Sequence, residues 1–243
     1  KLRHFANIRL VHREFDETED ILRQAEVEKV DGVLLDLGVS SHQIDADERG
    51  FAFRPGVALD MRMDRGQSFT AADILAKYSE RELTRVFREY GEERFARRIA
   101  NKIVAARAKQ PLALSDQLLE IIRQSVPGQM VVKSYARIFQ ALRIEVNQEL
   151  ERLKNALHGW LEHLNPGGRM VVISYHSLED RIVKQFFKEQ ENPCICPPEF
   201  PVCVCGRKPQ IRRIRPFLIR PEEDEIKDNP RARSAKMRVG EKL

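Results

Sequence analysis

A carboxylate, two hydroxyls and an amide follow one apolar run near the start of the chain. The apolar run opens the segment VDGVLLDLGVSSHQ, residues 30–43. After the run, the same segment contains Asp36, Ser40, Ser41 and Gln43. A short apolar run between turn residues is typical of a strand buried on both faces in a parallel sheet. Ligands of open α/β sheets bind beyond the carboxyl ends of strands, so we predict that these side chains line a cleft. A turn-capping role for Asp36 is the alternative.

A second apolar run predicts a neighbouring strand with polar groups at its end. Residues 170–175 are followed by His176 and Ser177 in the sequence RMVVISYHSLEDRIVK. Ser177 is predicted to cap a helix from about residue 178, with Asp180 completing a capping box. Two parallel strands would bring Asp36 and His176 to one sheet edge. The alternative for His176 is a structural hydrogen bond to the adjacent loop; His42 is a weaker candidate.

The elements that must position these groups predict an α/β fold with an inserted helical subdomain. Residues 8–15 are expected to form a strand and residues 17–28 a helix, before the strand at residue 30. Helical periodicity then dominates residues 70–125, and residues 134–164 predict one long helix or two. Later strands are expected within residues 211–219 and 236–242. The predicted ranges are residues 1–68 and 134–243 for the α/β part, with a mostly parallel sheet, and 69–133 for the insertion.

A long aperiodic segment, residues 44–69, contains the sequence RGFAFRPGVALDMRMD. Loops of this length are usually functional or disordered. Its arginines, Arg49, Arg54, Arg62 and Arg65, could meet phosphates, and Phe51 and Phe53 could stack on a base. Two plainer alternatives stay open: the phenylalanines pack on the inserted helices, and Asp60 and Asp64 pair with the arginines.

Composition indicates a soluble protein with a polyanionic partner. The chain has 243 residues, 42% of them hydrophobic, with 42 Lys and Arg against 37 Asp and Glu. No apolar run is long enough to span a membrane and no signal segment opens the sequence, so we expect a cytoplasmic location. Basic residues crowd the last forty positions, which suits nucleic acid, although a charge that serves only solubility is the alternative.

Four cysteines gather in two Cys-x-Cys pairs. They are Cys194, Cys196, Cys203 and Cys205, separated by a proline-rich loop. Two such pairs could close a tetrahedral zinc site, but the usual structural spacing is Cys-x-x-Cys. Free thiols in a stiff loop are the favoured alternative, and we assign no metal site.

Six sequence blocks in order resemble the MraW methyltransferase family. They are LLDLGVSS, RGFAFRPGVALDMRMD, YGEERFARRIA, RIFQALRIEVNQEL, GGRMVVISYHSLEDRIVK and NPRARSAKMRV. The resemblance implies a class I, Rossmann-like methyltransferase that uses S-adenosylmethionine to methylate N4 of a cytidine in small-subunit (16S) ribosomal RNA near the P site, acting on the RNA or the 30S subunit. It also implies that Phe15, Asp36 and Gln43 contact the cofactor.

The sequence departs from the family at its start. Members begin with a G-x-G-G-H loop and an acidic residue one strand later, and this sequence shows neither, so we expect it to be a fragment. A non-catalytic RNA-binding or assembly factor and a DNA amino methyltransferase are the alternatives. The absence of a D/N-P-P-Y/F/W tetrapeptide disfavours the second.

The chemistry of an amino group indicates what the site must supply. The exocyclic amine of cytosine is a poor nucleophile, because its lone pair is delocalised into the ring. A catalyst gains by accepting a hydrogen bond from that amine and by holding it in line with the methyl group. Asp36 with Ser40 or Ser41 would be the acceptor, and His176 could take the proton.

Overall fold

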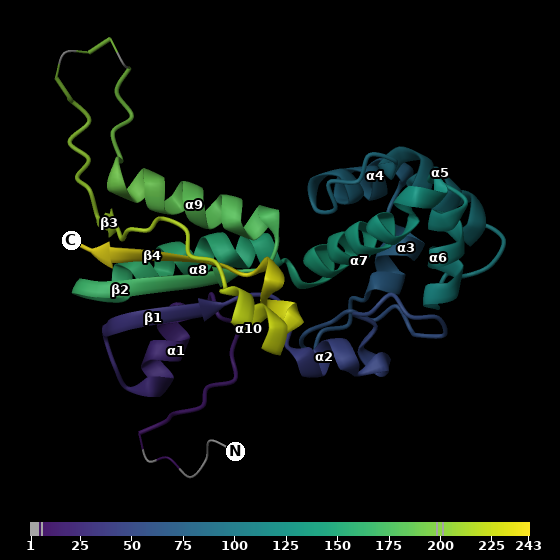
Figure 1. Cartoon of the computed structure of the whole chain (residues 1–243), viewed down its shortest axis with the longest axis horizontal. Helices are drawn as coiled ribbons and strands as arrows, with labels where there is room; N and C mark the ends of the chain where they lie inside the picture. Colours follow the sequence, from purple (N-terminus) through teal and green to yellow (C-terminus); the bar gives the residue numbers. More distant parts are fainter. Residues whose placement is uncertain (1–4, 6, 198, 201) are drawn as a thin grey trace. The chain divides into compact units, whose positions relative to one another are not determined.

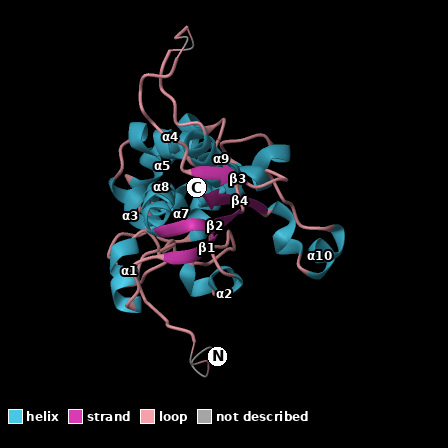
Figure 2. Cartoon of the chain, turned by 90° about the vertical axis from the view of Figure 1, so that its left-hand side faces the viewer, coloured by secondary structure: helices cyan, strands magenta, loops and turns pink. Residues whose placement is uncertain are grey.

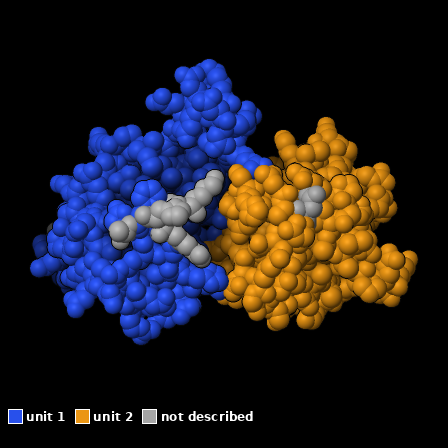
Figure 3. All heavy atoms as spheres, turned by 90° about the horizontal axis from the view of Figure 1, so that it is seen from below, with its two compact units in different colours: residues 1–38, 150–243 blue, residues 39–149 orange. Residues whose placement is uncertain are grey.

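The computed structural model describes residues 5, 7–197, 199–200 and 202–243, and the chain forms two compact units. Unit 1 contains residues 1–38 and 150–243, and unit 2 contains residues 39–149 (Figure 3). Unit 2 therefore interrupts the chain of unit 1. It is wider than the insertion predicted at residues 69–133, because it also takes in the arginine-rich loop and the helix that ends at residue 147.

Unit 1 is built on a four-stranded sheet (Figure 1). The strands lie in the order β1-β2-β4-β3 and are β1 (Val30–Asp36), β2 (Leu164–Ser174), β4 (Lys236–Lys242) and β3 (Ile211–Arg213). The pair β1/β2 is parallel, as predicted, whereas β2/β4 and β3/β4 are antiparallel. The prediction of a mostly parallel sheet is therefore wrong for the described strands.

Helices α8 (Glu149–His163) and α9 (Ser177–Glu191) supply the apolar layer of unit 1. Their buried side chains join Val33 and Leu35 of β1 and Met170 and Val172 of β2 in one core. The alternate residue of β1, Leu34, is 64% exposed. The prediction that β1 is buried on both faces is thus wrong, because its core contacts come from one face alone. The other helices among the described residues of unit 1 are α1 (Thr18–Ala25) and α10 (Glu223–Asp228), both labelled in Figure 2, and the 3-10 turn η3 (Pro230–Ser234).

Residues 8–15, predicted as a strand, form irregular chain instead. Arg9 contacts Glu26 at 3.0 Å and Arg13 contacts Glu17 at 3.7 Å. Leu10 is 64% exposed. An extended apolar segment becomes a strand only when a neighbouring strand takes up its backbone groups, and here side-chain contacts to α1 and its flanks hold the segment instead.

Unit 2 is helical around the aperiodic loop. Fully buried side chains, among them Phe87, Ile99, Leu118 and Ile138, form its core. Thr70 with Asp73, and Ser79 with Glu82, make capping boxes at two helix starts. The helices are α2 (Ser41–Asp45), α3 (Ala71–Lys77), α4 (Glu80–Glu89), α5 (Ala96–Arg107), α6 (Ser115–Arg123) and α7 (Val131–Asn147), with 3-10 turns η1 (Asp47–Arg49) and η2 (Gly128–Met130).

The chain between α7 and α8 resolves the choice between one helix and two. Gln148 has φ +52° and ends α7 in a left-handed conformation, so residues 131–163 form two helices. None of the described helices is long and apolar enough to cross a membrane.

Candidate active site

The parallel strands β1 and β2 end side by side and bring Asp36 and Tyr175 together. Asp36 pairs with Ile173 in the ladder, and Leu37 N–H still donates to the Ile173 carbonyl at 3.0 Å. Gly38 has φ +84°, a conformation that favours glycine, and turns the chain out of the sheet. The Tyr175 hydroxyl donates to Asp36 Oδ1 at 3.0 Å. The predicted edge therefore carries a carboxylate and the tyrosine that orients it.

Tyr175 was not among the predicted site residues. Burial and the hydrogen bond to Asp36 raise the pKa of Tyr175 to about 12, so the phenol stays protonated and remains a donor at neutral pH. Asp36 is exposed, and within the described part of the chain its Oδ2 accepts no hydrogen bond. One oxygen is thus fixed and the other is open to a ligand. A tyrosine directly after an apolar strand, with further polar residues behind it, was the signal that could have indicated it.

His176 is the N-cap of α9. Its Nδ1 accepts from Glu179 N–H at 3.4 Å, and the Glu179 carboxylate accepts from the backbone N–H of Tyr175 at 2.9 Å and of His176 at 3.2 Å. Glu179 is buried, and the His176 side chain is 10% exposed. The predicted cap, Ser177 with Asp180, is therefore wrong by one residue. The geometry matches the structural alternative for His176, and its catalytic role stays a prediction.

Asp180 contacts β4 rather than the helix start. Arg238 Nε donates to Asp180 Oδ1 at 2.7 Å, and Lys236 Nζ lies 3.3 Å from Oδ2. Burial alone would raise the pKa of Asp180, but the hydrogen bond and charge of Arg238 outweigh it and hold that pKa below its usual value. Two of the basic residues near the chain end thus have partners inside unit 1.

Ser40 and Gln43 begin unit 2 and cap α2. Ser40 Oγ accepts from Gln43 N–H at 3.2 Å, and Gln43 Oε1 accepts from Ser40 N–H at 2.9 Å. Ser41 is the first residue of this short helix, and His42 is exposed. Asp36 and His176 belong to unit 1, whereas Ser40 and Gln43 belong to unit 2. The catalytic and cofactor-binding roles of these four residues stay predictions.

Phe15 is held by α8 in unit 1. Its carbonyl accepts from Trp160 Nε1 at 3.0 Å, and its half-buried ring packs against the unit 1 core. The next residue, Asp16, contacts Arg152 Nη1 at 3.1 Å. The contact of Phe15 with the cofactor stays a prediction.

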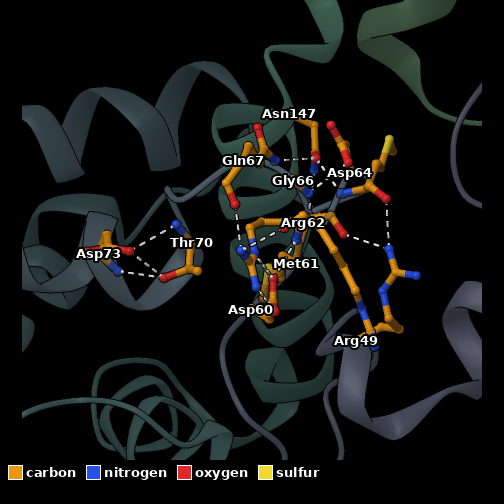
Figure 4. A network of polar contacts seen from close by, with 12 residues as sticks. Arg49, Asp60, Met61, Arg62, Asp64, Gly66, Gln67, Thr70, Asp73 and Asn147 are labelled. Carbon is orange, nitrogen blue, oxygen red and sulfur yellow. Dashed lines mark hydrogen bonds and ion pairs between the residues drawn. The ribbon is translucent and has the colours of Figure 1, made fainter. Parts of the chain in front are cut away.

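In unit 2 the arginine-rich loop is closed by its own side chains (Figure 4). Arg62 donates to both oxygens of Asp60, at 2.7 and 2.8 Å, and Arg49 Nη2 donates to the carbonyls of Arg62 and Met63 at 2.8 Å. The hydrogen bond from Arg62 is the main cause that lowers the pKa of Asp60. The alternative in which Asp60 pairs with an arginine is confirmed for Arg62, and the phosphate contacts of Arg49 and Arg62 stay a prediction.

Asn147, at the end of α7, ties the loop to the helices. Its Nδ2 donates to the carbonyls of Met61 and Arg143 at 2.8 Å, and its Oδ1 accepts from Met63 N–H at 2.7 Å (Figure 4). Gly50 has φ +71°, and a Cβ there would lie 2.3 Å from the Ala58 carbonyl oxygen. Sequence patterns did not indicate Asn147, because a polar residue at a helix end is common and its partners are remote in sequence.

The two phenylalanines of the loop contact the helices. Phe51 packs against the unit 2 core, and the Phe53 ring lies 6.0 Å from that of Phe139, centroid to centroid. Phe53 is nevertheless 42% exposed. Arg54 and Arg65 are also exposed, with Arg65 3.8 Å from Glu48. The plainer interpretation of the phenylalanines is confirmed, while Phe53, Arg54 and Arg65 still offer surface.

Comparison with known proteins decides the family. The family model described as "MraW methylase family" matches residues 1–243, the whole chain. The chain belongs to the MraW methylase family. The family predicted from the sequence blocks is thereby confirmed, and with it the class I methyltransferase fold.

Several relatives of this MraW chain carry one name, "Ribosomal RNA small subunit methyltransferase H". That of Syntrophotalea carbinolica is 51% identical over 237 residues, 96% of this chain and 76% of the relative. That of Caldicellulosiruptor saccharolyticus is 48% identical over 244 residues, 100% of this chain and 80% of the relative. That of Clostridium botulinum (strain Loch Maree) is 46% identical over 245 residues, 100% of this chain and 79% of the relative.

Proposed function

We propose that this MraW protein transfers a methyl group from S-adenosylmethionine to N4 of a cytidine in small-subunit ribosomal RNA, near the P site. The observation that carries the proposal is the identity of 46–51% with methyltransferase H relatives along 96–100% of the chain. An acceptor at the carboxyl end of the parallel pair is the local support, since Asp36 leaves one carboxylate oxygen open. Such a protein works where ribosomes are assembled, which makes the cytoplasm its proposed location.

The residues at the strand ends fit S-adenosylmethionine by their chemistry. Asp36 offers a negative, exposed acceptor, which suits the hydroxyl, amino and sulfonium groups of the cofactor. The left-handed turn at Gly38 exposes the backbone beside it. Phe15, which is half-buried, is the proposed contact of the adenine, and Gln43 is the third proposed contact. When bound, the cofactor supplies an electrophilic methyl group on a positively charged sulfur.

Asp36 is the residue proposed to act on the amino group. Its open oxygen would accept a hydrogen bond from N4, which increases the electron density on that nitrogen as it attacks. Tyr175 holds the other oxygen, so the carboxylate does not need to reorient during the step. Ser40 is the proposed second acceptor and His176 the proposed proton acceptor; the buried capping position of His176 makes its role the weaker one.

Exposed groups of unit 2 would contact the RNA. Phe53 presents an aromatic face for an unstacked base, and Arg54 and Arg65 present cations for phosphates. Either 16S RNA alone or the 30S subunit is the proposed partner.

A nucleoside analysis tests the function. Small subunits and naked 16S RNA from a bacterial strain that lacks methyltransferase H are incubated with the protein and isotopically labelled S-adenosylmethionine. The RNA is then digested and its nucleosides are separated by mass spectrometry. We expect labelled N4-methylcytidine from one of the two substrates, and a parallel incubation with duplex DNA to remain unlabelled.

The other outcomes separate the alternatives. RNA binding without label in either RNA substrate would favour a non-catalytic assembly factor, and label in DNA would favour a DNA amino methyltransferase. Label at C5 of cytosine or on a ribose would contradict the proposed nucleophile.

A further inference from the structure

The loop between α9 and β3 brings the four cysteines together. The Sγ atoms of Cys194, Cys196, Cys203 and Cys205 all lie within 4.8 Å of one another. Cys203 Sγ is 3.5 Å from that of Cys194, 3.9 Å from that of Cys196 and 3.4 Å from that of Cys205. All four are free thiols in the structure. A disulfide needs a separation of about 2.05 Å, so these contacts are not bonded pairs.

The three separations around Cys203 lie close to the edge length of a small coordination tetrahedron. With metal–sulfur bonds of about 2.3 Å, the corners of a zinc tetrathiolate lie about 3.8 Å apart. The three separations around Cys203 fall on both sides of that value. A multi-iron cluster would need a wider spread, because each thiolate ligates a different iron.

The backbone around the sulfurs is arranged to support thiolates. Val204 N–H donates to Cys196 Sγ at 3.3 Å. Such donors stabilise the negative sulfur of a metal ligand. Gly206, directly after the last cysteine, has φ +66°, so the chain can turn sharply away from the site.

None of the described residues of the loop is buried, so they form no apolar core that could organise it. Residues 192–210 include no helix or strand among those described, and Ile195, Val202 and Val204 are 65–72% exposed. Its base is closed where Gln210 N–H donates to the Gln190 carbonyl at 2.9 Å. Segments this short cannot bury an apolar core of their own and are usually stabilised by a metal or by disulfides.

We propose that Cys194, Cys196, Cys203 and Cys205 form a structural zinc site that organises the loop between α9 and β3. All four positions of the ion are filled by protein sulfur, so the site has a structural role and takes no part in methyl transfer. The bound ion carries a net charge of about −2 with its ligands, which the following Arg207 and Lys208 partly neutralise. The spacing of the cysteines in the sequence did not decide whether they bind zinc. The distances between the sulfur atoms favour a zinc site.

Elemental analysis of the unaltered chain is the first test. The protein is purified under reducing conditions from cells grown without added metal, and zinc, iron and copper are measured by mass spectrometry. We expect about one zinc per chain and little of the other metals. Titration of the four thiols with a mercurial reagent should then release the zinc in proportion to the thiols consumed.

Matched variants locate the ion. Cys196→Ser and Cys203→Ser should each lower the zinc content at least about 10-fold, whereas Val204→Ser, the same kind of change at an exposed position between two ligands, should leave it unchanged. Cobalt exchanged into the unaltered chain should show the intense visible bands of a tetrahedral tetrathiolate. Circular dichroism establishes whether each variant folds.

Four results would overturn the site: four reactive thiols with no metal, disulfides in the freshly purified chain, iron in place of zinc, or zinc that persists in both cysteine variants. Because the first test uses the unaltered protein, a variant that fails to fold does not leave the question open. Methylation activity is not the readout, so the zinc site and the proposed function can fail separately.

Discussion

Two nearly identical pentapeptides in this chain have opposite fates. GVLLD ends at Asp36 in unit 1, and GVALD ends at Asp60 in unit 2. Asp36 is exposed at the end of β1 and accepts one hydrogen bond, from Tyr175. Asp60 accepts two hydrogen bonds from the Arg62 side chain and one from its backbone. The pentapeptide alone sets neither role, because the residues after each aspartate differ: a left-handed Gly38 turns one chain outward and Arg62 returns to the other carboxylate.

The largest expected effect is at the open carboxylate. Asp36→Ala should lower the rate of methyl transfer to small-subunit RNA by about 100-fold or more, because the acceptor for the amino group is lost. Unfolding by urea should be nearly unchanged, since the side chain is exposed. Single-turnover methylation and circular dichroism measure the two effects. Full activity in the variant would remove Asp36 from the reaction.

In the hydrogen-bonded loop of unit 2, the largest effect on stability is expected at Asn147. Asn147→Ala should destabilise unit 2 by about 2 to 3 kcal/mol, because buried backbone groups of the loop lose their partners. Urea unfolding gives the change in the free energy of unfolding. Asn101→Ala, which removes a single exposed contact to Glu80, is the control and should change it little. Equal effects of the two substitutions would show that the loop does not depend on Asn147.

A pair of tyrosines sharpens the comparison, since each unit has one that donates to a carboxylate. Tyr175→Phe should slow methyl transfer about 5-fold, because a bond of about 1 kcal/mol that orients Asp36 is removed. Tyr78→Phe removes the bond to Glu145 and should leave the chemical step unchanged. Single-turnover rates of both variants test this. A slower chemical step in Tyr78→Phe alone would reverse the assignment.

A smaller loss of stability is expected when Arg62, whose guanidinium binds Asp60 within the loop, is replaced. Arg62→Lys keeps the charge but cannot make the two-pronged contact with Asp60, so we expect a loss of about 1 kcal/mol in the free energy of unfolding. Arg65→Lys, at an exposed residue of the same loop, should change it by less than about 0.5 kcal/mol. If Arg65→Lys alone weakened RNA binding, the division between structural and RNA-facing arginines would be supported.

Acid should lower the stability of unit 2, because its paired carboxylates become protonated. The hydrogen bond from Arg62 lowers the pKa of Asp60, and contacts with Lys77 and Thr70 lower that of Asp73 to about 2. A carboxyl whose pKa is lower in the folded state than in the unfolded chain stabilises the folded state. This stabilisation is complete above the pKa of the unfolded chain, 3.8, and is lost as the pH falls towards the pKa of the folded state. The protection factors of the α3 amides in hydrogen exchange, which correct for the slower intrinsic exchange in acid, should fall between about pH 4 and pH 2. Asp73→Asn should flatten this dependence; an unchanged profile would contradict the assignment.

Elements with a clear local period were predictable from the sequence. The strand β4, residues 236–242, has the predicted bounds, and α3 to α6 lie within the residues predicted as helical. The parallel pairing of β1 and β2 was also predictable, because two apolar runs separated by helices favour that arrangement. The bounds of these elements depend on neighbours a few residues apart, and the parallel pairing follows from the order of the elements.

The failures depend on side-chain contacts that the apolar period of the sequence does not reveal. Residues 8–15 have the composition of a strand, but side-chain contacts to α1 and its flanks hold them. The cap of α9 is His176 and not the predicted Ser177, because the buried Glu179 accepts hydrogen bonds from the backbone N–H groups of Tyr175 and His176. Asp36 was predicted from its place after a strand, whereas Tyr175 was found only when the register of β1 and β2 brought it within 3.0 Å of that carboxylate.

The close approach at Gly50 has a consequence for mutational tolerance. A methyl group there would need to share space with the Ala58 carbonyl and the Asp60 amide, in a backbone conformation already unfavourable for side chains. At Gly56, in the same loop, φ is +78° but nothing lies within 4 Å of the added carbon. A saturation library should therefore recover almost no variant at position 50, while position 56 should accept asparagine or aspartate, the residues that best tolerate left-handed backbone.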